Sequence, residues 1–231
     1  MTKFPRPYKI PERRAVSEIP VSPHSPNFIA DIVAEIHRIE WPYTKAETMK
    51  VKGVEIPIKD LLRNRDQGLA AYIALIGPRI TEALKRKRKD FTVEPDRILV
   101  AAFLPGKRGD MRKNLYLPRT GPRAPLTEIF LKWLEQVPSD PEAFVFPSAK
   151  PFGFIHWDRR LERARAHWIM KSTIGKFPHW YRSVCETYIG KLVFKSDAFK
   201  LRKYMGVKRL ESVVPYVNEP FQADLEDFDK R

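Results

Sequence analysis

Apolar residues recur at intervals of three and four in two stretches near the start of the chain. The first stretch spans about 27–39, and Asn27 stands where the cap of a helix is expected. The second spans about 60–76 and runs into the Gly-Pro pair that begins at Gly77, where proline prevents the helix from continuing. These patterns predict two amphipathic helices, after which Arg79 begins a third.

The pattern changes to strand-like alternation in the middle of the chain. Residues 97–104 and 113–118 both read as strands, and a polar segment with several cations joins them. A third apolar run, 143–147, is short enough to be a strand as well. We expect these three segments to form a small antiparallel sheet in which a basic hairpin joins the first two strands.

Helical spacing returns in the rest of the chain. Five further helices are predicted, over residues 125–137, 156–170, 179–190, about 196–205 and about 208–217. The predicted fold class is therefore α+β, mainly α, with one small three-stranded antiparallel sheet. A chain of 231 residues is long enough for one substantial core. We expect that core to be one domain over residues 27–217.

The two ends of the chain differ from this domain in composition. Residues 1–26 hold six prolines among five cations, which predicts an extended basic arm. Residues 218–231 carry five acidic residues against two basic ones and would be repelled by DNA. Phe221, Leu225 and Phe228 would form a short apolar stripe on a helix, suited to docking on a protein surface. A frayed, solubilising terminus is the alternative for this tail.

Charge and cysteine content narrow the classes of function. The formal net charge is +15, and self-repulsion of that size is usually offset by a polyanion, nucleic acid before membrane. Cys185 is the single cysteine, which excludes an internal disulfide and a paired-cysteine metal site. The five histidines lack metal-binding spacing, and no apolar run predicts a signal peptide or a membrane span. We therefore expect an intracellular protein with no metal and no cofactor.

The segment FPHWYRSV places a histidine and an arginine three positions apart, His179 and Arg182. At that spacing the two side chains lie one above the other on a helix and can reach the same point. Taken alone, such a pair is more often a surface contact, or a core histidine bonded to a backbone carbonyl, than a functional site.

Several other segments stand in a fixed order around this pair. In the first of these, RNRDQGLAAYIALIGPRITEAL at 63–84, a predicted helix ends at a glycine two residues before Arg79. Glu82 follows three residues after that arginine. LPGKRGDMRKNLYLP carries Lys107 on the predicted hairpin, and FVFPS follows it. In YMGVKRLESVVPYV, Tyr216 comes ten residues after a glycine. Over about 60–217, this order resembles the catalytic domain of the tyrosine recombinases, the lambda-integrase-like family.

The resemblance implies a site-specific DNA recombinase or integrase that cuts and rejoins DNA through a 3′-phosphotyrosyl intermediate, without metal or ATP. The implied catalytic residues are Arg79, Lys107, His179, Arg182 and Tyr216, with Glu82 supporting them. In these roles the two arginines hold the scissile phosphate, because a guanidinium stays protonated and bonds two oxygens. Lys107 protonates the leaving 5′ oxygen, and His179 bonds the phosphate or assists proton loss from Tyr216.

Cations flank the predicted site on two segments. Eight of them are candidates for contacts with the DNA backbone: Lys85, Arg86, Lys87, Arg88, Lys89, Arg108, Arg112 and Lys113. The run at 85–89 is also compatible with an ordinary solvated face. The cations around Lys107 share its hairpin and compete with it for the role of general acid. The expected partners are double-stranded DNA, further copies of the chain in a dimer or tetramer on DNA, and accessory proteins, with no membrane.

Three features depart from the family pattern. Val207 occupies a position where the family usually has a histidine or tryptophan, and valine cannot donate a hydrogen bond to phosphate. Pro215 precedes the candidate nucleophile and disfavours a regular helix there. Only about 60 residues precede the first segment, so we expect no separate core-binding domain.

These departures keep alternatives open for the activity and for the nucleophile. One alternative is a DNA-binding protein that has kept the recombinase fold with degenerate or no strand exchange. A type IB topoisomerase would use much the same set of residues, although the compact spacing favours recombination. The other tyrosines that compete with the candidate nucleophile are Tyr181, Tyr188 and Tyr204.

Overall fold

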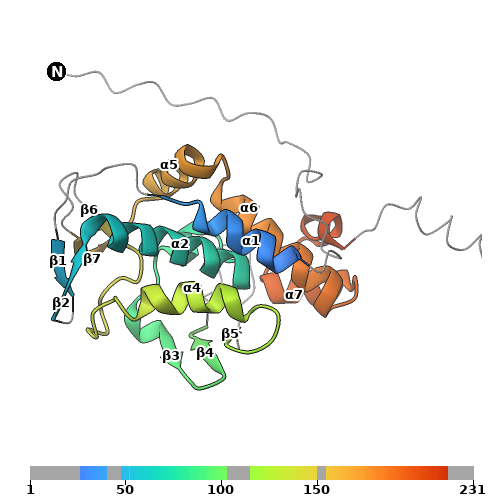
Figure 1. The fold of residues 1–231 in the computed structure, drawn as a ribbon. Coiled ribbons are helices and arrows are strands. Elements are labelled where there is room, and N and C mark those ends of the chain that lie inside the picture. Colours follow the sequence, from blue (N-terminus) through green and yellow to red (C-terminus); the bar gives the residue numbers. More distant parts are fainter. Residues whose placement is uncertain (1–26, 41–47, 52, 103–114, 150–154, 218–231) are drawn as a thin grey trace, which may run out of the picture.

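The structure, a computed structural model, describes residues 27–40, 48–51, 53–102, 115–149 and 155–217 (Figure 1). The predicted basic arm, the acidic tail and the part of the hairpin that carries Lys107 lie outside these residues.

A long central helix organises the fold. This helix, α2 (Ile58–Ile76), is buried along most of its length, because its polar positions as well as its apolar ones face other elements. It packs against α1 (Phe28–His37), α4 (Ala124–Leu134) and α6 (Pro178–Thr187), which surround it in Figure 1. Tyr72 of α2 stacks on Phe130 of α4 with ring centroids 5.3 Å apart. The predicted first, second and fourth helices are thus present, within a few residues of their expected bounds.

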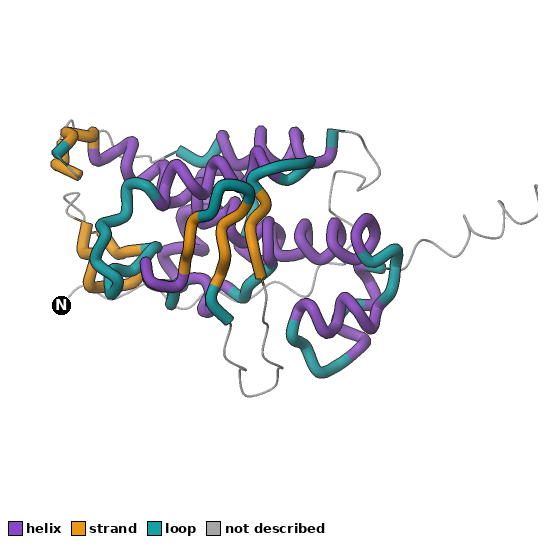
Figure 2. The backbone as a smooth tube through the Cα atoms, turned by 90° about the horizontal axis from the view of Figure 1, so that it is seen from below, coloured by secondary structure: helices purple, strands orange, loops and turns teal. Residues whose placement is uncertain are grey.

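The three-stranded antiparallel sheet is present, but one of its strands differs from the prediction. Its order is β3 (Phe91–Val93), β4 (Arg97–Val100) and β5 (Leu115–Pro118), and Figure 2 shows the strands side by side. The prediction that 143–147 supplies the third strand is wrong. That segment is apolar because Val145 and Phe146 are buried in the core. Its backbone joins the 85–89 segment, where the amide of Val145 bonds the carbonyl of Arg86 at 2.9 Å.

Two further hairpins lie outside the predicted sheet. One pairs β1 (Thr48–Val51) with β2 (Val54–Pro57), and the other pairs β6 (Pro147–Ala149) with β7 (Ile155–Arg160). The prediction of a helix over 156–170 is therefore wrong in its first part, and α5 (Arg163–Ile174) forms only the second. Pairing with β6 holds the first part extended, and Trp157 stacks on Trp133 with centroids 5.9 Å apart.

The last part of the described chain forms a smaller core beside the first. After α6, a π-helical turn, η3 (Tyr188–Val193), leads into α7 (Ala198–Met205). The helix predicted over 208–217 is instead two short 3-10 turns, η4 (Leu210–Ser212) and η5 (Val214–Tyr216). Pro215 explains the second, because its ring has no N–H and restricts the preceding residue. Val207, Val213 and Tyr216 are buried in this second core.

Candidate functional site

Helix α6 carries the histidine and arginine that the sequence singles out. It begins with Pro178 at its first position, where the missing amide costs nothing. His179 lies in the first turn and is exposed, whereas Arg182, one turn later, has only 6% of its surface exposed. Partial loss of hydration lowers the pKa of the His179 imidazole, and the positive charge of Arg182 lowers it further. The neutral form is therefore favoured at pH 7.

Arg182 is held by two different partners. Its Nε forms an ion pair of 2.9 Å with Oε1 of Glu186, one turn later on the same helix. Its Nη1 donates a hydrogen bond of 2.7 Å to the backbone carbonyl of Gly77. Two contacts on different edges fix the plane of the guanidinium. These two contacts use Nε and Nη1, two of the three nitrogens of the guanidinium.

The turn after α2 positions the other candidate arginine. Gly77 ends α2 with a φ of +59°, a conformation that glycine adopts without strain, and α3 (Ile80–Ala83) follows. Arg79 is the cap of α3, and its backbone amide bonds Oε2 of Glu82 at 2.7 Å. The Arg79 Nη1 also bonds Oε1 of Glu82 at 2.9 Å. Arg79 is thus tied to Glu82 at both ends while its side chain stays 46% exposed.

Tyr216 lies against α6 beside Arg182. The turn that carries it packs on α6, and its hydroxyl is 3.4 Å from Oγ of Ser183. Ser183 in turn donates to the carbonyl of His179 at 3.1 Å. Burial raises the pKa of Tyr216 to about 12, and the charge of Glu186 contributes to the rise, while Ser183 and Arg182 oppose it. The hydroxyl is therefore protonated at neutral pH.

Two polar residues of this site, Ser183 and Glu186, are absent from the sequence-based set. Both are buried, on a helix that also buries Arg182 and Thr187 among its apolar residues. A buried carboxylate one turn after an arginine is a detectable signal, because the i, i+4 spacing predicts an ion pair. The sequence does not reveal that the same helical face meets Tyr216, which arrives from thirty residues later.

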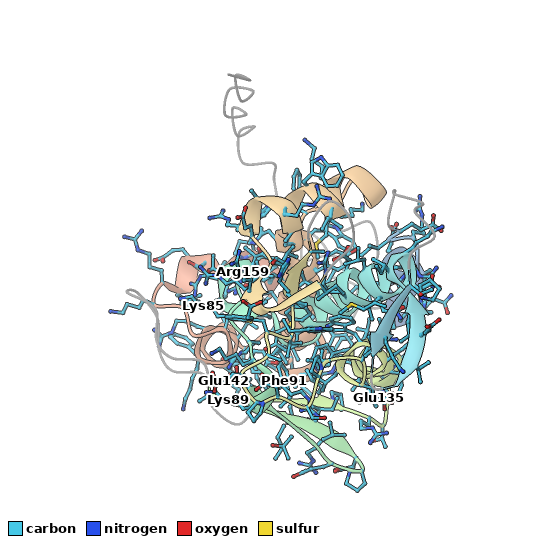
Figure 3. All side chains as sticks on the ribbon, turned by 90° about the vertical axis from the view of Figure 1, so that its left-hand side faces the viewer. Lys85, Lys89, Phe91, Glu135, Glu142 and Arg159 are labelled. Atoms are coloured by element: carbon cyan, nitrogen blue, oxygen red, sulfur yellow. The ribbon has the colours of Figure 1, made fainter. Side chains whose placement is uncertain are left out.

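The cations of the 85–89 run are engaged in several different contacts. Lys85 is exposed, but Arg86 is buried and lies 3.6 Å from the carboxylate of Asp90. Lys87 and Lys89 both pair with Glu142, and Figure 3 shows Lys89 beside that glutamate. Burial makes Arg86 part of the fold, so its predicted role as a DNA contact does not fit its position.

The remaining cations of the predicted DNA-binding set divide into two groups. Arg88 is half-buried and donates from Nη1 to the carbonyl of Phe91 at 3.0 Å. Lys107 and its hairpin neighbours Arg108, Arg112 and Lys113 lie outside the described residues. Open positions for phosphate contacts in this region are therefore fewer than the sequence run implies.

The described residues offer neither a metal site nor a membrane span. No group of three or more histidine, cysteine or acidic side chains is placed there to hold a metal ion. No helix of the described chain has the length and apolar content to cross a membrane.

The candidate residues that the structure describes lie on three neighbouring segments of the chain. Arg182 and His179 lie on α6, Tyr216 packs against that helix, and Arg79 follows the turn whose carbonyl Arg182 binds. A cation, a neutral imidazole and a tyrosine hydroxyl on adjoining pieces form a set that can bind a phosphodiester and attack it.

Comparisons with known proteins identify the fold. No protein-family model matches the chain, and no curated protein matches it significantly in sequence. The XerH site-specific recombinase bound to palindromic difH substrate, in a post-cleavage complex, matches with a TM-score of 0.57 and 19% identity, over 87% of this chain and 50% of that one. The XerH pre-cleavage complex with difH substrate matches with a TM-score of 0.53 and 18% identity, over 87% and 51%.

The chain therefore spans about half the length of these XerH structures. The match rests on the arrangement of the elements, since the sequence identity is low. It agrees with the mainly helical fold and the small antiparallel sheets described above. The chain has the fold of a tyrosine recombinase catalytic domain.

Proposed function

We propose that the protein is a site-specific DNA recombinase that cuts and rejoins DNA through a covalent bond between Tyr216 and a 3′ phosphate. One observation carries this proposal above the others: Tyr216 packs against α6, the helix that carries His179 and Arg182. Its hydroxyl is 3.4 Å from Oγ of Ser183 on that helix. The fold is that of enzymes with this type of chemistry. A net charge of +15 supports DNA as the partner.

The proposed reaction assigns a role to each group. The Tyr216 oxygen attacks phosphorus and loses its proton, a P–O bond to the tyrosine forms, and the bond to the 5′ oxygen breaks. Arg79 and Arg182 stabilise the charge that develops on the nonbridging oxygens, which is usually the largest contribution to catalysis. Rejoining is the reverse reaction with a new 5′ hydroxyl, so the phosphotyrosyl bond conserves the energy and no ATP is consumed.

The other groups handle protons and position. His179 is favoured in its neutral form, so it can accept a hydrogen bond from the tyrosine or donate one to the phosphate. Lys107 is the proposed donor of the proton that the 5′ oxygen takes. Glu82 would hold Arg79 in place through the two bonds described above.

The proposed partners follow from the same chemistry. Double-stranded DNA is the substrate, and we propose that copies of the chain associate on it as a dimer or tetramer. Exposed apolar side chains on two packed elements, Val193 of η3 and Phe199 of α7, are 50% and 69% exposed and are candidates for such a contact. The protein would be DNA-associated in the cell.

A second function is favoured by one specific observation. Val207 is buried in the second core with 7% of its surface exposed, at a position where the family pattern has a hydrogen-bond donor. A site that lacks this donor stabilises the transition state less well. The second candidate is therefore a DNA-binding protein with this fold and degenerate or no strand exchange.

A nicked suicide substrate distinguishes the two functions. Cleavage of such DNA releases a short fragment, which prevents rejoining and traps the covalent complex. For a recombinase, the wild-type protein gives a protein–DNA band that survives denaturation, and Tyr216→Phe gives none while still binding DNA. Tyr204→Phe is the matched control, because Tyr204 lies half-buried in the same core and is not the proposed nucleophile. Binding without a covalent band in the wild-type protein would support the second candidate.

A further inference from the structure

Glu186 is a buried carboxylate to which the proposed reaction assigns no role. It is 3% exposed, in the last turns of α6, among residues that form the contact between the two cores. Burial removes the hydration of a carboxylate, and this cost must be offset by a cation or hydrogen-bond donors. The cation that pairs with Glu186 is Arg182, and the charge of Glu186 also acts on Tyr216, so both affected groups belong to the candidate site.

The first of these groups is Arg182. The Nε of Arg182 pairs with Oε1 of Glu186 at 2.9 Å, and its Nη1 donates to the carbonyl of Gly77. The two acceptors together set the orientation of the plane. Because a guanidinium carries five N–H donors, these two contacts leave donors that can bind an incoming phosphate oxygen. An arginine held in this way needs no reorganisation when the substrate arrives.

Glu186 also acts on Tyr216 through its charge. The pKa of Tyr216 is raised first by burial and then by the negative charge of Glu186. Arg182 and Ser183, also on α6, act in the opposite direction. The other elements packed around the tyrosine contribute apolar residues of the second core, among them Ile189, Leu201 and Val213. Glu186 is thus the anionic group, among the described residues, that acts on the tyrosine hydroxyl.

We propose that Glu186 is a positioning residue for DNA cleavage, which orients Arg182 toward the phosphate that Tyr216 attacks. This inference rests on the proposed function. The ion pair holds Arg182 on the helix against which Tyr216 packs, so the phosphate holder and the nucleophile meet the same phosphodiester. Glu186 takes no part in bond making and does not contact DNA.

The test compares Glu186→Ala and Glu186→Gln with the wild-type protein. Covalent-complex formation on the nicked substrate is measured across pH, together with non-covalent DNA binding. Glu186→Ala removes the ion pair with Arg182 and the negative charge that acts on Tyr216, and we expect a fall in rate of about tenfold to a hundredfold, the scale of a misplaced catalytic group. Glu186→Gln keeps an oxygen that can accept from Arg182 but removes the charge. We expect a smaller fall, and a pH profile displaced to lower pH because the tyrosine then ionises more readily.

Asp66→Asn is the matched control for structural effects. Asp66 is also a buried carboxylate paired with an adjacent arginine, Arg65, at 2.8 Å, but it lies on α2 within the first core. This variant is expected to lose stability without displacing the pH profile of cleavage. A spectrophotometric titration of tyrosine in the DNA-free protein, taken as the difference from Tyr216→Phe, gives a second readout of the effect of the Glu186 charge on Tyr216.

Each outcome decides the inference. It is supported if Glu186→Gln displaces the pH profile and lowers the pKa of Tyr216 in the titration while Asp66→Asn does neither. It is overturned if Glu186→Ala cleaves at the wild-type rate, or if the folded fraction of each Glu186 variant cleaves with the wild-type pH profile. Failure of the proposed function has a different signature, since the wild-type protein itself would then form no covalent complex.

Discussion

The Nη1 of Arg182 donates a hydrogen bond of 2.7 Å to the backbone carbonyl of Gly77, a residue 105 positions earlier in the chain. This bond joins α6 to the turn between α2 and Arg79. The position of the Arg182 side chain in the candidate site therefore depends on the conformation of that turn. Gly77 is also closely packed, since a Cβ built on it would lie 2.8 Å from Cε of Met205 and 3.2 Å from Sγ of Cys185.

Replacement of Gly77 by alanine tests how far this turn determines stability. We expect the φ of +59° to cost about 1–2 kcal/mol in an alanine, and the contact with buried Cys185 to add about 1–3 kcal/mol. The measurement is urea denaturation. Gly121→Ala is the matched control, because Gly121 has a φ of +77° but nothing within 4 Å of its Cβ position. Equal losses in the two variants would show that packing around Gly77 contributes nothing.

The buried Arg182–Glu186 pair predicts strong coupling between two substitutions. Arg182→Ala leaves the Glu186 carboxylate buried without its cation, and we expect a loss of about 3–5 kcal/mol in the free energy of unfolding. The double variant Arg182→Ala, Glu186→Ala should lose less than the sum of the two single changes. Arg79→Ala, which breaks the more exposed Arg79–Glu82 pair, is the control and should cost about 0–1 kcal/mol. Additive losses would contradict a direct interaction.

The buried Tyr216 predicts a specific loss of stability at alkaline pH. Its pKa is about 12 in the folded protein against an ordinary value of 10.0. Below pH 10 the tyrosine is protonated in both states, so its full contribution is present. Between pH 10 and 12 the unfolded state releases the proton first, and stability falls with a slope approaching about 1.4 kcal/mol per pH unit.

Chemical denaturation as a function of pH measures this slope. Tyr216→Phe should unfold with a shallower slope over the same range, because it has no proton to release. Tyr116→Phe removes the same hydroxyl from an exposed strand position and is the control. If the wild-type protein and Tyr216→Phe show the same slope, the hydroxyl is not buried in solution.

The pairing of Lys87 and Lys89 with Glu142 predicts a gain in DNA affinity when that glutamate is neutralised. The two hydrogen bonds from the lysines hold the pKa of Glu142 at about 2, so the carboxylate is charged at neutral pH. Glu142→Gln removes the competing anion and leaves two lysines for phosphate. We expect tighter binding and a plot of log affinity against log salt that is steeper by about 1–2.

Glu135→Gln is the matched control for this experiment. It makes the same change of charge at an exposed position, and Figure 3 shows Glu135 to the right of Glu142 and Lys89 and apart from both. Its salt dependence should match that of the wild-type protein. An unchanged slope in Glu142→Gln would mean that neither lysine reaches the DNA backbone.

The sequence by itself determined the elements whose signals are local. Helix α2 follows from apolar spacing that ends at Gly77, and α6 follows from the apolar stripe around His179 and Arg182. Both depend on contacts within a few residues, which a linear pattern records directly. The turn at Tyr216 was foreseeable for the same reason, since Pro215 acts on its immediate neighbours.

Only the tertiary structure decided which distant segments meet. An apolar run such as 143–147 can form either a strand or an irregular segment buried in the core. The structure shows that this run is buried and that β3 pairs with β4 to complete the sheet. The burial of Arg86, the bond from Arg182 to Gly77 and the contact between Ser183 and Tyr216 depend in the same way on contacts between separated parts of the chain. A sequence pattern specifies which face of an element is apolar, but the partner for that face is selected by packing across the whole fold.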